Sequence, residues 1–106
     1  MNVQLAPAHR EEIERIIRRA GVDFDRHRPV LFGSRATGQA RRYSDVDIGL
    51  AGEPLSMDTL ARLTDAFEES DLPYRVDVVN LANMSETFQA SALADAMPLG
   101  SPRQAR

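Results

Sequence analysis

Three segments of the chain carry hydrophobic residues at the spacing of an α-helix that buries one face. The segment over residues 7–21 repeats isoleucine at helical intervals, at Ile13, Ile16 and Ile17. The segment over residues 56–70 starts at a typical N-cap serine and has the apolar stripe Leu60, Leu63 and Phe67. The segment over residues 85–97 also starts at a serine, and its expected inward side chains are Phe88, Ala92 and Ala96. We therefore predict three amphipathic helices.

Three short apolar runs lie between these segments and predict β-strands. They cover residues 28–33, 44–52 and 74–81, and the last is dense in β-branched residues. A full helix joins the second run to the third, so these two strands should be parallel neighbours. Only about a dozen residues join the first run to the second, which favours antiparallel pairing. The pattern predicts an α/β fold with a small three-stranded mixed sheet and about four helices, the fourth a short one within residues 34–42.

Size and composition fit one small globular domain. The chain has 106 residues, and we expect one minimal domain over residues 1–100 followed by a flexible tail over 101–106. The net charge of −3 argues against broad binding to nucleic acid, which depends on neutralising phosphates. There is no cysteine, no signal peptide and no apolar run of membrane-spanning length. The expected location is the cytoplasm, without a membrane partner.

Two aspartates, Asp45 and Asp47, begin the second predicted strand. Because side chains alternate along a strand, the two carboxylates share one face and lie within about 7 Å of each other. Asp77 interrupts the third strand and can lie across from them. Three such carboxylates could hold two Mg²⁺ ions about 3.5–4 Å apart, as in displacements at phosphorus. The alternative is a solvated strand face; the pair Asp23 and Asp25 has the same spacing, and we assign it no function.

A Gly33-Ser34 turn directly follows the first predicted strand. Glycine allows a close approach of the backbone, and a helix that starts at Ser34 would direct free N–H groups towards phosphate oxygens. Arg35 could add a charge-assisted contact to the phosphates. On its own, a Gly-Ser pair after a strand is more often only a structural turn. Its place upstream of Asp45 and Asp47 turns it into a candidate nucleotide site.

The stretch "GSRATGQARRYSDVDIGL", together with "RVDVVNL", resembles the signature of the DNA polymerase beta-like nucleotidyltransferase superfamily. The wording of the motif is most similar to the minimal nucleotidyltransferases, the MNT antitoxins of HEPN–MNT toxin–antitoxin pairs. The resemblance implies that the nucleotide is bound by Gly33, Ser34, Arg35 and Ser44. It implies that Asp45, Asp47 and Asp77 ligate two Mg²⁺ ions and that Asp77 helps to deprotonate the attacking hydroxyl. Asn80 stands where relatives often carry a further acidic residue, at a position that we interpret as peripheral.

The resemblance also implies a reaction and a partner. It implies transfer of AMP from ATP to a tyrosine hydroxyl of a HEPN ribonuclease toxin, which silences the toxin. A chain this small has no room for an acceptor-binding domain, so a hetero-oligomer with the toxin is expected. Two alternatives stay open: a non-catalytic antitoxin that acts by binding, and a nucleotidyltransferase for a small molecule or an RNA end.

Overall fold

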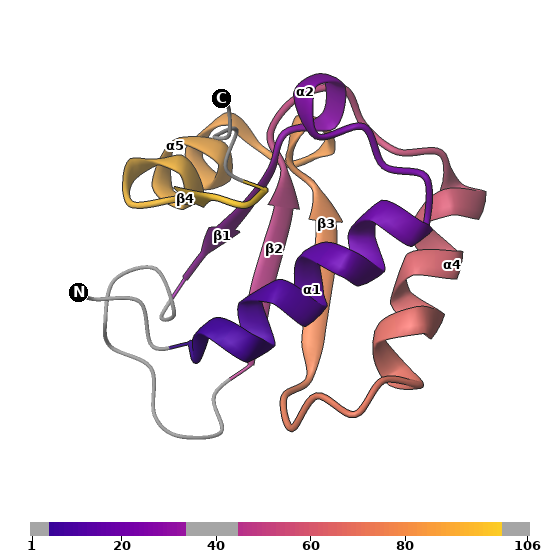
Figure 1. Cartoon of the computed structure of the whole chain (residues 1–106). Coiled ribbons are helices and arrows are strands. Elements are labelled where there is room, and N and C mark those ends of the chain that lie inside the picture. Colours follow the sequence, from indigo (N-terminus) through magenta and orange to yellow (C-terminus); the bar gives the residue numbers. More distant parts are fainter. Residues whose placement is uncertain (1–4, 34–44, 101–106) are drawn as a thin grey trace.

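A four-stranded mixed sheet forms the centre of the molecule (Figure 1). The structure, a computed structural model, describes residues 5–33 and 45–100. The strands lie in the order β3-β2-β1-β4. Their bounds are β1 Pro29–Phe32, β2 Val46–Leu50, β3 Val76–Asn80 and β4 Met97–Pro98. The helices are α1 Pro7–Arg19, α2 Phe24–His27, α4 Met57–Glu68 and α5 Glu86–Ala94, with a 3₁₀ turn, η1, over Leu81–Asn83.

Both strand pairings predicted from the connections are confirmed. β1 and β2 are antiparallel, and β2 and β3 are parallel across the α4 crossover. A short link cannot return the chain to the same end of the sheet, whereas a helix can, and this constraint decides both directions.

The helices begin where local chemistry favours a start. Pro7 occupies the first turn of α1, where its missing N–H costs nothing. The Ser56 and Ser85 hydroxyls accept hydrogen bonds from the backbone N–H groups of Thr59 and Phe88, which caps α4 and α5. Both predicted caps are therefore confirmed.

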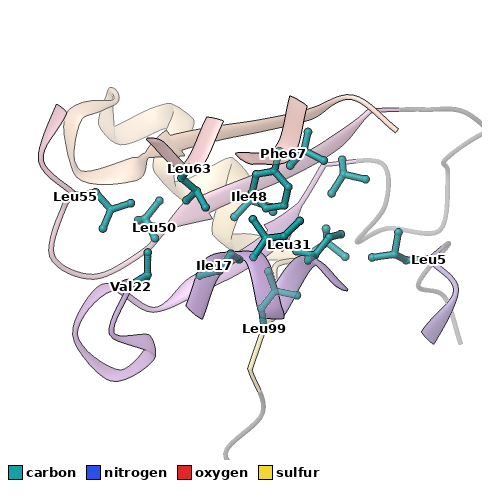
Figure 2. Packing of buried hydrophobic residues seen from close by; sticks show 14 residues of the cluster. Leu5, Ile17, Val22, Leu31, Ile48, Leu50, Leu55, Leu63, Phe67 and Leu99 are labelled. Atoms are coloured by element: carbon teal, nitrogen blue, oxygen red, sulfur yellow. The ribbon is translucent and has the colours of Figure 1, made fainter. Parts of the chain in front are cut away.

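The main core lies between one face of the sheet and the helices α1 and α4 (Figure 2). It is built from the apolar positions of the predicted helix stripes and from alternate strand residues. Fully buried members of it include Ile13, Ile17, Leu31, Ile48 and Leu63. A buried leucine of this kind stabilises the fold by about 1.5–3 kcal/mol, so this layer supplies most of the stability.

The opposite face of the sheet carries a smaller apolar cluster beneath α5. Val30, Leu81 and Ala92 are its buried members, and Val79 and Phe32 pack against it. Gly49 makes this packing possible, because a Cβ there would lie 2.8 Å from the Leu81 side chain. This partial cover leaves Asp47 and Asp77 half-exposed on the same face.

Four features depart from the expectations drawn from the sequence. The sheet has four strands instead of three, because Met97 and Pro98 pair with Leu31 and Val30 as a short edge strand. The third predicted helix therefore ends at Ala94 instead of residue 97. Phe88 is 38% exposed and not inward. The single-turn helix α2 was not expected, while the short helix expected within residues 34–42 lies outside the described part of the chain.

No helix among the described residues is long and apolar enough to cross a bilayer.

Candidate active site

Three neighbouring strands bring one residue each into a row on the face that carries α5. Asp47 of β2 is in register with Asp77 of β3 on one side and with Phe32 of β1 on the other. Partners in register project to the same face of a sheet. The parallel crossover through α4 therefore brings together two carboxylates that are thirty positions apart in the sequence.

Gly33 adjoins this row and leaves room for the Asp47 carboxylate. Its φ of +76° lies in the left-handed region, which glycine adopts at no steric cost. A Cβ at this position would lie 2.5 Å from Oδ2 of Asp47. Glycine is thus required twice here, once by the turn of the backbone after β1 and once by the carboxylate beside it.

The carboxylates form a concentration of negative charge. Burial, the neighbouring Asp77 carboxylate and the Asp45 carboxylate together raise the pKa of Asp47 above its ordinary value. Asp45 is exposed and directly precedes β2. Asp77 is less isolated, because its Oδ1 lies 3.4 Å from Nε of Arg75 in an exposed ion pair. A cation placed beside Asp47 would offset the repulsion that raises its pKa.

A hollow of about 500 Å³ follows the edge strand β3 and opens onto these acids. Its lining combines the two carboxylates with apolar and aromatic side chains: Phe32, Asp47, Thr64, Val76, Asp77, Val78, Val79 and Phe88. A second hollow, of about 200 Å³, adjoins it beside Gly33 and shares Phe32 and Phe88. The two together offer charged and apolar surface to one ligand.

The structure locates four of the seven predicted site residues. It places Gly33, Asp47 and Asp77 together, with Asp45 close enough to act on the pKa of Asp47. Ser34, Arg35 and Ser44 lie outside the described residues. Within residues 5–33 and 45–100, no three acidic or histidine side chains form a group that could hold a metal ion by themselves. The predicted three-carboxylate metal site therefore stays a prediction.

Two aromatic residues of the site were not predicted as site residues from the sequence. Phe32 was expected only as a strand residue and Phe88 only as a core residue of the last helix. Their rings meet edge to face with centroids 6.0 Å apart, and both line the hollow with the acids. The available signal was strand alternation, because Phe32 directly precedes Gly33 and belongs to the opposite face from the buried Leu31.

Asn80 does not line the hollow beside the acids and has a structural role. Its side chain is only 6% exposed. The Asn80 amide accepts a hydrogen bond of 2.8 Å from the N–H of Leu55 and donates one of 3.0 Å to the carbonyl of Leu55. It thus ties the end of β3 to the loop that leads into α4. Aspartate could make only the first of these bonds, which explains why the amide is suited to this position.

The profile of the family described as polymerase beta, nucleotidyltransferase, matches residues 11–102. This match covers most of the chain, and the protein therefore belongs to that family. The predicted superfamily and its fold are confirmed, and the fourth strand corrects the predicted number of strands.

Known proteins similar to this chain include a curated relative and a solved structure. The probable protein adenylyltransferase MntA of Haemophilus influenzae is 49% identical to it over 59 residues. That segment is 55% of this chain and 52% of the relative, so the similarity spans about half of the MntA protein. A crystal structure described as a toxin–antitoxin with AMP-PNP superposes with a TM-score of 0.69 at 25% identity. It covers 90% of this chain and 75% of that one.

Proposed function

We propose that the protein is an antitoxin that transfers AMP from ATP to a tyrosine hydroxyl of a cognate HEPN toxin and so neutralises it. The observation that carries this proposal is the register of Asp47 with Asp77 beside Gly33, in a chain of the nucleotidyltransferase family. The similarity to a probable protein adenylyltransferase supports a protein acceptor. The similarity to a toxin–antitoxin structure with AMP-PNP supports a toxin partner and a nucleoside triphosphate as donor.

The site residues fit Mg²⁺ as the metal. Mg²⁺ prefers oxygen ligands and is commonly held by one or two carboxylates together with phosphate oxygens of a substrate. Asp47 and Asp77 offer two carboxylates in register, and burial together with the Asp77 and Asp45 carboxylates raises the pKa of Asp47. Asp45 is the third ligand implied by the motif. Bound there, Mg²⁺ would neutralise negative charge on the phosphates.

The residues of this chain would orient the reactants and receive the proton. In the proposed reaction the tyrosine oxygen forms a bond to the α-phosphorus, and the bond from that phosphorus to the bridging oxygen of pyrophosphate breaks. Asp77 accepts the hydroxyl proton, either directly or through water. Gly33 keeps the space beside Asp47 open to the phosphates. Ser34, Arg35 and Ser44 would complete the phosphate contacts.

The acceptor hydroxyl belongs to a second protein in this proposal, so the working form is a hetero-oligomer. The open edge of β3 and the hollow along it give that hydroxyl access to the acids. The predicted cytoplasmic location belongs to the same proposal, and cell fractionation would check it.

Transfer of label from ATP tests the proposal. The purified chain is incubated with Mg²⁺, ATP labelled at the α-phosphate, and the HEPN protein encoded beside it. We expect label on the toxin, and at least a hundredfold slower labelling by Asp47→Asn, because that variant loses a carboxylate ligand.

Asp25→Asn is the matched control for this experiment. Asp25 belongs to the other Asp-x-Asp pair, is exposed, and lies in α2 apart from the row of site residues. This variant should label the toxin at the rate of the unchanged protein. The proposal fails if the unchanged protein labels no tyrosine of the toxin, or if Asp47→Asn labels it equally fast. Label found on RNA or on a small molecule instead would support a different acceptor.

A non-catalytic antitoxin is the second candidate, and the ion pair of Asp77 with Arg75 favours it. A carboxylate already paired with a cation has less to gain from a metal ion. The two hypotheses predict different growth of cells that express the toxin. If contact alone neutralises the toxin, Asp47→Asn restores growth as well as the unchanged protein does; if AMP transfer neutralises it, Asp47→Asn restores none.

A further inference from the structure

Phe88 is a large aromatic side chain that the fold leaves open to solvent beside the acids. It is 38% exposed, although its helix also carries the buried Ala92. The Ser85 cap fixes where α5 begins, and the backbone N–H of Phe88 itself donates that capping bond. Phe88 therefore lies in the first turn of α5. Single exposed apolar side chains are common on protein surfaces, and Phe88 differs from Met57 and Leu93 in lining the hollow that contains the acids.

The Phe88 side chain packs against the ring of Phe32. The two rings meet edge to face, with centroids 6.0 Å apart and an interplanar angle of 81°. Such a contact leaves a ring face free for another planar group, and it holds the ring in place before that group arrives. A preorganised aromatic face loses little entropy when a ligand stacks on it.

Phe88 lines both hollows of the site, as does Phe32. It lines the larger one with Asp47 and Asp77, and the smaller one with Gly33 and Ser91. A nucleoside triphosphate needs cation-assisted contacts for its phosphates and an apolar face for its base. The acids would hold the cation and Gly33 leaves room beside them, and the Phe88 ring, which lines both hollows, provides the apolar face.

We propose that Phe88 stacks on the nucleobase of the nucleoside triphosphate and positions it for transfer. This inference rests on the proposed function and names the residue that holds the base. Ser91 is the one hydroxyl among the described residues that line the smaller hollow. An aromatic face accepts every base because every base has a π face. We therefore expect Phe88 to contribute binding for ATP and GTP alike.

A tryptophan at position 88 would report on the stacking directly. The chain has no tryptophan, so Phe88→Trp introduces a single indole fluorophore. The ligands are α,β-methylene ATP, which cannot be cleaved between its α and β phosphates, and inorganic tripolyphosphate, each with Mg²⁺. We expect the nucleotide to quench the fluorescence and tripolyphosphate to leave it unchanged, since only the nucleotide carries a base.

Calorimetric titration of Phe88→Ala and Phe88→Leu measures the effect on affinity. Both variants should bind α,β-methylene ATP and its GTP counterpart about tenfold more weakly, the size of one aromatic–base stack. Leucine keeps the apolar volume without the ring, so Phe88→Leu separates stacking from a general loss of packing. Tripolyphosphate should bind the variants and the unchanged protein equally well. Thermal unfolding of each variant confirms that it is folded.

Leu93→Ala is the matched control on the same helix. Leu93 is 43% exposed and lines a different hollow, with Pro98 and Leu99. This variant should bind the nucleotide as the unchanged protein does. Equal nucleotide affinity in folded Phe88→Leu and the unchanged protein overturns the inference, as does an indole signal that tripolyphosphate changes as strongly as the nucleotide does.

These experiments can refute the stacking of Phe88 without refuting the proposed function, and the reverse. Binding is measured without toxin, so a chain that binds nucleotide through Phe88 but labels no toxin would refute only the antitoxin reaction. A chain that labels the toxin but binds nucleotide independently of Phe88 would refute only the stacking. A chain that binds no nucleotide would refute both.

Discussion

Asp47 is a site residue whose carboxylate is suited to a ligand but destabilises the fold when no ligand is bound. Its backbone and its position in β2 belong to the central sheet, where an apolar side chain facing α5 would pack without penalty. Instead it carries a charge beside Asp77 and near Asp45, and its pKa is raised by burial and by both of these carboxylates. Residues at functional sites commonly show such perturbed pKa values, because the arrangement that suits a ligand is unfavourable without it.

Replacing Asp47 by asparagine should therefore stabilise the protein in the absence of divalent cations. Like charges directly opposite each other on neighbouring strands are destabilising, and cross-strand pairs are worth about 0.2–1 kcal/mol. We expect a gain in the free energy of unfolding of that size at pH 7, measured by urea denaturation in the presence of a chelator. Asp25→Asn is the control and should leave this free energy unchanged.

The gain should depend on pH in one direction. Because the folded state raises the pKa of Asp47, the proton is bound more tightly in the folded chain than in the unfolded chain. The stability that this proton contributes is present below the unfolded pKa and is lost as the pH rises through the raised, folded pKa. The advantage of Asp47→Asn should thus shrink as the pH falls from 7 towards 4. An advantage that grew on acidification would contradict the assigned cause.

At the scale of elements, the sequence predicted what periodicity and chain connection control. The apolar stripes of the first two helices, the Ser56 and Ser85 caps and both strand directions are confirmed, because each follows from local spacing or from the length of one connection. The fold and the pairing of Asp47 with Asp77 followed from these. The resemblance of the motif added the family, which the family match confirms.

The elements that the sequence missed depend on contacts distant in the chain. β4 is two residues long and includes a proline, so it forms only because β1 offers an open edge. Phe88 was expected in the core, but the buried cluster beneath α5 includes only Ala92 of this helix, and Phe88 packs instead against the ring of Phe32. Local periodicity predicts neither where a helix lies over a sheet nor whether a short segment pairs with an edge strand.

Asn80 offers the prediction that belongs to this scale, because it links β3 to the loop before α4. Asn80→Asp should lower the free energy of unfolding by about 2–4 kcal/mol, since a buried carboxylate would face the Leu55 carbonyl without a donor. Asn83→Asp makes the same chemical change at an exposed position of η1 and should have little effect. Urea denaturation of both variants measures the difference. Equal stability of the two variants would show that the Leu55 contacts do not hold this loop.

At the scale of the molecule, the two faces of the sheet carry unequal layers. Among residues 5–33 and 45–100, the cluster under α1 and α4 contains fourteen buried side chains, whereas the cluster under α5 contains three. Since burial of apolar surface is the main source of stability, α5 is held less tightly than the helices opposite it. The site residues lie at the boundary between the firm sheet and this lightly held helix. Asp47 thus lies on the central sheet, and Phe88 lies on the helix that packs over the smaller buried cluster.

Hydrogen exchange should resolve this difference between the layers. Backbone amides of Glu86–Ala94 in α5 are expected to exchange through a local opening that needs less free energy than global unfolding, whereas amides of β2 exchange only on global unfolding. Leu63→Ala removes a fully buried side chain of the main core and should lower global stability by about 2–5 kcal/mol. It should therefore speed exchange in β2 and leave exchange in α5 nearly unchanged. Equal acceleration in both elements would mean that the protein unfolds as one cooperative unit and that α5 has no separate freedom.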